Sequence, residues 1–328
     1  MINFFYAFLI TVLLLSTALY GQESPLTQYW YTYDGAMTGA RAIGMGGAFT
    51  AITDSAESVY WNPAGLVFVQ NTQLCFMFDM GKESNAKTSK INEHKPIDRG
   101  SLLFTGIAGK EGSVSCRPLS RYTKINEQGD ETELVINQYT ISSASQSDEN
   151  TFFGMNLNYF KGYLGSLIND SKEMNLSHGA GWGIDWGFIF IKDPAFSLGV
   201  LLQNAPAYMY WRDYKNDKIP FVLRVGTGSR FNGAGILSLE YERRYYKGTD
   251  DLQVYHMGIE QYMSNSMVLR MGAYGTTLTK QDKVTYTMGL GFRRLKYNVD
   301  IAVEQYKLSI DKDLEVVYEM VSSITINF

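Results

Sequence analysis

The sequence predicts an all-β chain that closes into a transmembrane antiparallel β-barrel of about fourteen strands, preceded by an N-terminal periplasmic plug segment. Three observations favour this fold class: period-two alternation of apolar side chains, strands near bilayer-crossing length, and connections that alternate between long and short. The chain has 328 residues and is 14% aromatic, with 31 Gly but 7 Pro, which suits aromatic belts and tight turns. A mean hydropathy of -0.16 fits a barrel because only every second strand residue faces lipid.

The first 21 residues have the pattern of a secretory signal peptide. An apolar run from Phe4 to Leu19 is too short for a convincing transmembrane helix, and cleavage is expected near Gly21-Gln22. No Lys or Arg precedes the run, so an uncleaved N-terminal anchor is the alternative. We therefore divide the chain into a signal peptide at 1–21, a plug segment at 22–71 and a transmembrane barrel at 72–328.

From residue 72 onward, apolar side chains alternate with small or polar ones. In 151–159, for example, four apolar side chains oppose Gly154, Asn156 and Asn158. The predicted strands are 72–81, 99–109, 112–119, 134–144, 151–160, 180–191, 195–204, 219–230, 234–246, 253–263, 267–275, 284–293, 296–305 and 316–328. The predicted longer connections are 82–98, 120–133, 161–179, 205–218, 247–252, 276–283 and 306–315.

This alternation of long and short connections predicts loops outside the cell, tight turns in the periplasm, and both chain ends on the periplasmic side. The weakest strands are 112–119, which contains Pro118, and 134–144, so a barrel of twelve strands is the alternative. The expected localisation is the bacterial outer membrane. Phe328 ends an alternating strand, which resembles the C-terminal signal read by the barrel-assembly machinery.

Alternation also assigns a set of charged residues to the inner wall. A polar inner face is what a plugged or watery lumen requires. These charges either brace and solvate the lumen or take part in gating. They are Asp185, Arg224, Arg230, Glu240, Glu242, Glu260, Arg270, Asp300 and Glu304.

The segment before the barrel does not alternate and carries two dense motifs, RAIGMGGA at 41–48 and YWNPAG at 60–65. Gly44, Gly46 and Gly47 permit close backbone approach and positive φ. Asn62, Pro63 and Gly65 are typical of a turn in which Asn caps, Pro fixes φ and Gly takes the left-handed position.

These motifs resemble the N-terminal region of the outer-membrane family that groups FadL-type transporters of hydrophobic compounds with the PorV and PorQ proteins of type IX secretion. The sequences of the two motifs are most similar to those of the PorV/PorQ-like branch. The resemblance implies a fourteen-stranded barrel in which this segment folds into the lumen as a plug. Arg41, Asp54 and Glu57 would then pair with lumen charges.

Other chemistry finds little support in the sequence. The glycine run at 44–47 lacks the Lys-Ser/Thr of a nucleotide loop, and the net charge of -4 without a basic cluster argues against nucleic acid. His94, His178 and His256 form no recognisable catalytic or metal-ligand pattern with acidic residues. We expect no enzyme activity, no metal and no cofactor.

Aromatic and aliphatic residues gather in two predicted outer connections. They are Tyr163 and Leu167 in 161–179, and Tyr208, Tyr210, Trp211 and Tyr214 in 205–218. They form either an interfacial aromatic girdle or a rim site for an apolar ligand or a partner protein. The spacing of Tyr163, Leu164, Leu167 and Ile168 fits one face of a short helix.

Two functional hypotheses follow. In the first, which we favour slightly, a hydrophobic small molecule crosses the outer membrane through a plugged barrel. In the second, a non-conducting surface scaffold of PorV/PorQ type binds or hands over proteins exported by type IX secretion. The expected partners are outer-membrane lipid, the barrel-assembly machinery during biogenesis, and either a hydrophobic molecule or an exported surface protein.

Overall fold

The computed structural model describes residues 37–84, 101–125, 131–167, 174–231, 234–246, 250–279, 283–310 and 313–328. The predicted signal peptide at 1–21 and the first part of the predicted plug, residues 22–36, lie outside the described residues. In the described ranges, no helix is long and apolar enough to cross a membrane.

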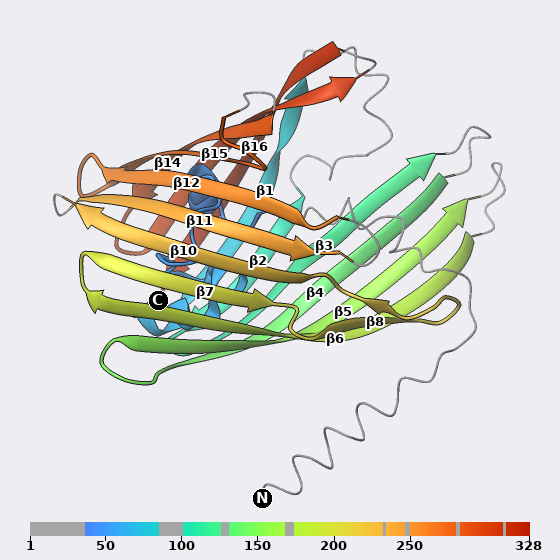
Figure 1. Ribbon diagram of the computed structural model, residues 1–328, viewed down its shortest axis with the longest axis horizontal. Helices are drawn as coiled ribbons and strands as arrows, with labels where there is room; N and C mark the ends of the chain where they lie inside the picture. The colour runs from blue at the N-terminus through green and yellow to red at the C-terminus, as the bar shows by residue number, and fades with distance from the viewer. Residues whose placement is uncertain are drawn as a thin grey trace, which may run out of the picture.

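Antiparallel strands form one closed barrel (Figure 1). Fourteen strands make the ring, because β1–β7 and β10–β16 pair in series and β5 also pairs with β6. The predicted barrel of fourteen strands is therefore confirmed. Its strands are β1 (Gln73–Ser84), β2 (Leu102–Gly109), β3 (Gly112–Ile125), β4 (Glu131–Gln146), β5 (Thr151–Leu167), β6 (Met174–Asp193), β7 (Phe196–Gln203), β10 (Phe221–Phe231), β11 (Gly235–Tyr245), β12 (Leu252–Tyr262), β13 (Met267–Gly275), β14 (Val284–Arg293), β15 (Tyr297–Ile310) and β16 (Asp313–Asn327).

The first and last strands complete the ring. β1 pairs with β16 from Gln73↔Asn327 to Ser84↔Val317, and the Phe328 N–H donates to the Thr72 carbonyl at 2.9 Å. Closure satisfies the backbone groups that hydrocarbon cannot hydrogen-bond. Tight turns such as Lys110-Glu111 gather at one end, the turn end, and the opposite end is called the loop end (Figure 1).

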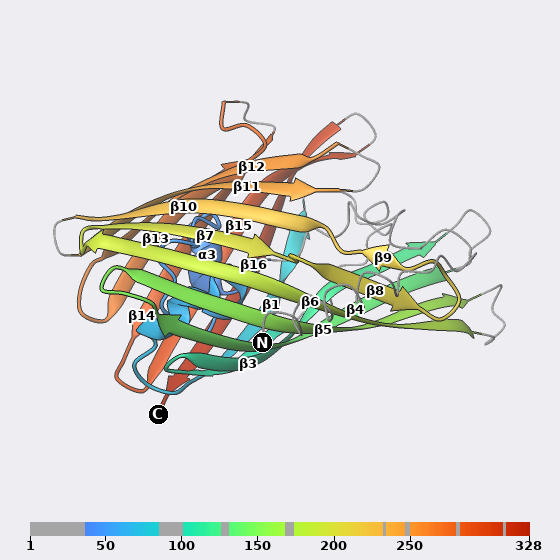
Figure 2. The same cartoon turned by 60° about the horizontal axis from the view of Figure 1, so that its bottom comes forward.

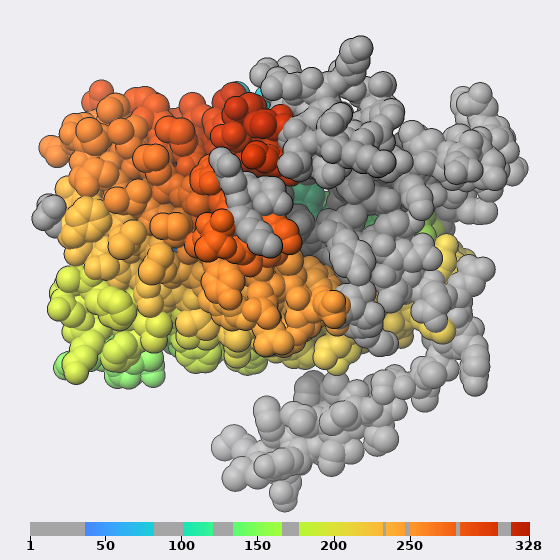
Figure 3. All heavy atoms as spheres, turned by 45° about the horizontal axis from the view of Figure 1, so that its top comes forward, coloured from blue at the N-terminus to red at the C-terminus, as the bar shows by residue number. Residues whose placement is uncertain are grey.

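The outward face of the barrel is apolar. Ile141, Leu157 and Met288 have exposed fractions of 62%, 52% and 62%, and Figure 3 shows the outward side chains of β10–β16 as a continuous surface. Paired aromatic rings, such as Tyr241 and Tyr255 at 5.5 Å, lie toward the loop end. A wall so apolar around its circumference requires lipid contact, as in a transmembrane barrel.

Several strands run further toward the loop end than the sequence predicts. The predicted connection 161–179 lies largely in β5 and β6, so the predicted short helix is wrong: Tyr163 and Leu164 belong to β5. Likewise β3 reaches Ile125, β4 begins at Glu131, β15 reaches Ile310 and β16 begins at Asp313. The apolar outward pattern ends where the bilayer ends, whereas backbone pairing continues beyond it.

Two further strands, β8 (Ala207–Trp211) and β9 (Asp217–Lys218), occupy the predicted connection 205–218. β7 pairs with the turn-end part of β6, and β8 pairs with residues 179–183 of β6 nearer the loop end. Asn204 lies between them at φ 59, a conformation that Asn tolerates well. Its N–H donates to Asp185 Oδ1 at 2.7 Å and its side chain donates to the Pro220 carbonyl at 2.9 Å, which fixes the bend.

The lipid-facing wall makes a testable prediction at Met288. Met288→Arg is expected to lower the free energy of unfolding by about 2–4 kcal/mol in a bilayer, because an outward charge would lie in hydrocarbon. Unfolding titrations in lipid vesicles measure this change, with Met288→Ala as the control for lost side-chain volume. A value for Met288→Arg no larger than the control would contradict a membrane-facing wall.

Candidate functional site

Residues 37–71, called the inner segment, lie inside the barrel nearer the turn end (Figure 2). The segment contains α3 (Ala40–Gly44), α4 (Ser58–Trp61) and η2 (Pro63–Phe68). α3 contacts β13–β16 and η2 contacts β4–β6, so the segment touches the wall on opposite sides. Trp61 is fully buried at its centre and donates through Nε1 to the Thr38 carbonyl at 2.6 Å.

Inward glycines let the wall touch the backbone of the inner segment. A Cβ added at Gly258 would lie 2.2 Å from Met45 O, and one at Gly272 would lie 2.3 Å from Gly46 N. Any larger residue would therefore displace the segment. Seven strands, β5, β6, β7, β10, β12, β13 and β14, each supply a glycine against the inner segment, which meets five of them with backbone and Gly187 and Gly228 with side chains. Together these glycines form the glycine collar: Gly154, Gly187, Gly199, Gly228, Gly258, Gly272 and Gly289.

The motif glycines face this collar. Gly46 and Gly47 have φ values of 64° and 76°, which favour glycine. Gly44 packs directly on the backbone of Gly289, since a Cβ at Gly44 would lie 2.9 Å from the Gly289 Cα. The Gly46 carbonyl bonds His256 Nδ1 at 2.8 Å, and the Gly44 carbonyl accepts from Thr287 Oγ1 at 3.2 Å. The sequence therefore indicated close approach correctly, although Gly44 itself lies in α3 without a positive φ.

The Asn-Pro-Ala-Gly motif joins the segment to the opposite wall. Asn62 accepts the Ala64 N–H at the start of η2, and its amide donates to Thr50 O at 3.0 Å and to Phe188 O at 2.9 Å. Pro63 begins η2, where its missing N–H is not needed. The predicted left-handed conformation of Gly65 is wrong, since Gly65 lies within η2. Its small size matters instead, because a Cβ there would lie 2.5 Å from Thr53 O.

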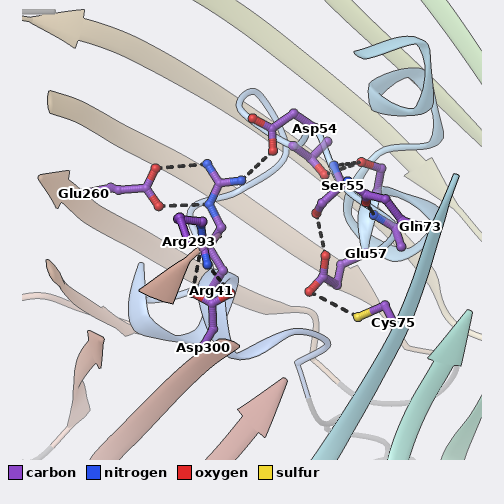
Figure 4. A network of polar contacts seen from close by, with 12 residues as sticks. Arg41, Asp54, Ser55, Glu57, Gln73, Cys75, Glu260, Arg293 and Asp300 are labelled. Carbon is purple, nitrogen blue, oxygen red and sulfur yellow. Dashed lines mark hydrogen bonds and ion pairs between the residues drawn. The ribbon is translucent and has the colours of Figure 1, made fainter. Parts of the chain in front are cut away.

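A chain of alternating charges ties α3 to the wall (Figure 4). Arg41 donates twice to Glu260, each time at 2.9 Å, and also pairs with Asp54. Burial alone would lower the pKa of Arg41, but the carboxylates of Asp54 and Glu260 outweigh it and hold that pKa well above its ordinary value. The guanidinium therefore stays charged inside the barrel.

The chain continues across the wall. Arg270 bonds Glu260 at 2.6 Å and Asp300 at 2.8 Å, and Arg293 bonds Asp300 at 2.8 Å. Three guanidiniums thus meet three carboxylates, and the chain is neutral overall. Sequence alternation placed Glu260, Arg270 and Asp300 on the inner face, but their mutual pairing follows from strand order and register.

A second charged group contacts α4. Arg224 bonds Glu242 at 2.7 Å and the Tyr60 hydroxyl at 3.1 Å, and the Arg117 guanidinium lies 4.2 Å from the Tyr60 ring centroid. Burial acts to raise the pKa of Tyr60, but Arg224 and Arg117 outweigh it and lower that pKa. Glu240 accepts the N–H groups of Phe49 and Thr50 at 3.0 and 2.8 Å. The Glu240 carboxylate therefore satisfies two backbone donors that would otherwise be buried without partners.

Of the other residues predicted to line the lumen, some face inward as predicted and one is exposed to solvent. Asp185 is buried and accepts from the Asn156 and Asn158 side chains, each at 2.9 Å. Glu304 accepts from the Tyr274 hydroxyl at 3.0 Å. Arg230 is solvent-exposed near the turn end rather than enclosed in the lumen.

A polar cavity of about 200 Å³ lies beside α3 at the turn end, lined among others by Arg41, Asp54, Glu57, Arg293 and Asn298. Glu57 bonds Ser55 Oγ and accepts from the Cys75 thiol at 3.6 Å, and Figure 4 shows these side chains around the charged chain. Within the described ranges, no group of three His, Cys, Asp or Glu side chains is placed to hold a metal ion.

At the loop end, the inner wall becomes apolar on one side. Leu134, Ile136, Phe160, Met209 and Trp211 are buried together there. The predicted rim residues therefore lie on both faces of the wall. Trp211 faces inward, and Tyr214 packs against the same cluster. Tyr208, Tyr210 and Tyr163 face outward. Leu167 ends β5, and its side chain lies outside the described residues.

Within the described residues, β2 and β3 are paired only near the turn end. Their ladder runs only from Gly109↔Gly112 to Thr105↔Cys116, whereas β3 continues beside β4 to Ile125. Beyond Cys116, the described part of the chain gives β3 no ladder partner on its β2 side. Pro118 lies two residues beyond this point, and the register of β3 against β4 shifts between Pro118 and Ser120. The sequence showed Pro118 as a weakness in a strand, but not the opening beside it.

A notch of about 210 Å³ occupies this opening, lined among others by Leu102, Thr105, Pro118 and the inward-facing Arg117. On the outer wall, an apolar groove of about 450 Å³ continues from it, because Thr105 and Cys116 line both. Leu74, Ile107, Val114, Ile141 and Leu157 contribute to the groove. Notch and groove therefore adjoin on the outer wall, and the inward-facing Arg117 lines the notch from the inner side.

Comparison with known proteins supports the fold. No family model matches the chain, and no curated protein matches it. The Pseudomonas putida toluene transporter TodX is similar in structure, with a TM-score of 0.67 and 14% identity over 90% of this chain and 100% of that chain. The CymD monoaromatic hydrocarbon channel gives a TM-score of 0.66 and 14% identity over 90% of this chain and 98% of that chain.

The Ralstonia pickettii toluene transporter TbuX gives a TM-score of 0.64 and 14% identity over 91% of this chain and 100% of that chain. A Pseudomonas aeruginosa FadL homologue gives a TM-score of 0.59 and 11% identity. At such identities the likeness shows a FadL-type barrel fold. It covers nearly the whole of each chain.

The glycine collar predicts a sharp difference between two alanine substitutions. Gly272→Ala is expected to loosen the inner segment, because its Cβ would lie 2.3 Å from backbone. Gly112→Ala is the matched control, since its Cβ would meet nothing nearer than 3.6 Å. Limited proteolysis of the inner segment in folded protein distinguishes them, and equal protection of both variants would contradict the contact.

The charged chain predicts a graded response to loss of single carboxylates. Glu260→Gln is expected to destabilise the inner segment by about 3–5 kcal/mol, because two buried guanidiniums lose their shared partner. Asp54→Asn is expected to destabilise the inner segment by about 1 kcal/mol or less, because the Asp54 side chain is 40% exposed and its ion pair is screened by water. Hydrogen exchange of residues 37–69 measures both effects, and an equal response would show that burial does not set the energy of these pairs.

Proposed function

We propose that the protein is an outer-membrane channel for hydrophobic small molecules. Cargo enters at the loop end, contacts the apolar cluster around Phe160 and Trp211, and leaves through the notch between β2 and β3 into the bilayer. The observation that carries the proposal is the connection of the notch with an apolar groove on the lipid-facing wall. In this arrangement the turn end faces the periplasm.

The inner segment supports a sideways exit. The glycine collar and the Arg41 and Asn62 contacts hold the segment on several sides of the barrel, so moving it would break many contacts at once. The notch, in contrast, lies where backbone pairing has already stopped. We therefore infer that the inner segment acts as a fixed plug and that cargo passes above it.

The similar structures add to this proposal, since they are named as toluene transporters and a monoaromatic hydrocarbon channel. Small apolar solutes also suit the groove, which is lined mainly by aliphatic and aromatic side chains. The alternative of a PorV/PorQ-type scaffold for exported proteins stays a prediction from the N-terminal motifs, and none of the compared structures supports it.

Blocking the notch tests the route. Thr105→Trp is expected to reduce uptake of a labelled monoaromatic solute into proteoliposomes to near background, because Thr105 lines both notch and groove. Thr227→Trp, the same change on the opposite wall in β10, is the control and should transport normally. Equal uptake by both variants would exclude this exit.

Locking the inner segment tests the fixed plug. The Ala40 N–H donates to Ser323 Oγ at 2.8 Å, so Ala40→Cys with Ser323→Cys can join segment and wall by a disulfide. Cys75 and Cys116, both free thiols, are first replaced by Ala. Uptake by the oxidised protein is expected to equal uptake by the same protein after reduction. Transport that returns only on reduction would show that the segment must move.

A further inference from the structure

We propose that the outward face of β5, β6, β8 and β9 at the loop end binds the phosphate headgroups of anionic membrane lipids. The binding surface, called the basic patch, consists of Lys161, Arg212 and Lys218. These strands lie side by side and extend furthest at the loop end (Figure 2). This inference is independent of what passes through the barrel.

The register of the strands places the patch beside a row of aromatic residues. Tyr159 of β5 lies opposite Trp182 of β6, which lies opposite Tyr208 of β8. Directly opposite residues in antiparallel strands share a face. On the outer wall, the Tyr159 side chain is 49% exposed and the Tyr208 side chain is half-buried. The ring centroids of Trp182 and Tyr208 lie 5.7 Å apart. Such a row marks the interface between hydrocarbon and headgroups.

The basic residues lie at this row or just beyond it. Lys218 is directly opposite Tyr208, and Lys161 follows Tyr159 by two residues on the same face. Two residues of a strand rise about 6.6 Å, less along the membrane normal because strands tilt. Arg212 continues the outward alternation of Tyr208 and Tyr210 beyond β8. The patch therefore lies at the level of lipid phosphates.

The side chains are placed to meet an anion. All three are solvent-exposed. The Lys161 ammonium lies 5.3 Å from the Tyr163 ring centroid, which keeps it against the wall. The Arg212 N–H donates to the His178 carbonyl at 3.0 Å, which fixes its backbone beside β6. An ammonium and a forked guanidinium are the groups that proteins use for phosphate.

The distribution of charge supports the same partner, although the whole chain carries -4. Among the loop-end strand residues whose side chains the structure describes, the outward charged ones are basic: Lys161, Lys218, Arg243 and Lys307. The acidic residues of those strands, Asp217, Glu242, Glu304 and Glu319, lie on the inner face, whereas Asp213, Asp250 and Asp251 lie in the connections between strands. Arg243 pairs with Asp251 at 2.8 Å, so it is not part of the patch. The described outward side chains of the strands are therefore positive at the level of the patch, with Asp213 as the one acidic residue outside the strands that is directly next to a patch residue in the chain.

The test compares lipid binding by two triple variants of the full chain. The loop-end variant carries Lys161→Gln, Arg212→Gln and Lys218→Gln. The control variant carries Lys110→Gln, Lys192→Gln and Lys296→Gln, three exposed lysines at the turn end with the same total charge change. Each protein in neutral detergent micelles is titrated calorimetrically with short-chain phosphatidic acid, with phosphatidylcholine of the same chains, and with inorganic phosphate.

We expect wild-type protein and the control variant to bind phosphatidic acid in preference to phosphatidylcholine. The loop-end variant should bind it more weakly by about fivefold for each basic residue removed. Binding by the wild-type protein should also weaken as salt is raised, which tests the patch even if the variant folds poorly. Equal loss in both variants, no loss in the loop-end variant, salt-independent binding, or equally tight binding of inorganic phosphate would each overturn the proposal.

Discussion

The contact between the inner segment and the glycine collar is the constraint on which the rest of the structure depends. The inner segment brings backbone against the wall at Met45, Gly46 and Ala64, and side chains against it at Pro63 and Ile52. The wall must therefore lack a Cβ at each matching position. Because seven strands supply a glycine at this level, the contact fixes both where the segment lies and how the strands are staggered around it. The charged chain and the buried Trp61 then fill the remaining interior.

Charge inside this barrel is balanced locally. Arg41 brings a positive charge into the interior, and Glu260 meets it with two hydrogen bonds before Arg270 and Asp300 extend the pairing. An unpaired charge in this position would be costly, so each strand supplies a partner of opposite sign. The same carboxylate chemistry holds the loop after α3, where Glu240 accepts two backbone N–H groups. Segment and wall are consequently specified together.

The opening between β2 and β3 begins where the two strands part, because their ladder ends at Thr105↔Cys116 although β2 continues to Leu102. β2 begins at Leu102, whereas β3 and β4 remain paired as far as Ile125 and Glu131. Proline at 118 and the shifted register after it suit a strand that has lost one neighbour. A barrel that is closed at the turn end and interrupted nearer the loop end can keep its inner segment in place and still offer a passage through its wall.

The sequence by itself determined the barrel and the direction in which most side chains point, because alternation is local and is read directly from the order of residues. It favoured fourteen strands over twelve, and strand pairing then decided the number. Phe153, Leu157 and Tyr159 face outward, and Asn156 and Asn158 face inward, as their alternation predicts. The motif around Gly46 and Asn62 likewise indicated close backbone approach and a turn. Strand ends were less well determined, since β5 and β6 continue beyond the apolar pattern that marks the bilayer.

Only the tertiary structure decided which residues meet. Arg41 and Glu260 are 219 positions apart, and their pairing depends on strand order, register and the path of the inner segment together. The separation of Trp211 from Tyr210 depended on β8, a strand that exists because β6 is long enough to pair with both β7 and β8. The notch arises where two strands stop pairing, which is a relation between strands that no local pattern records.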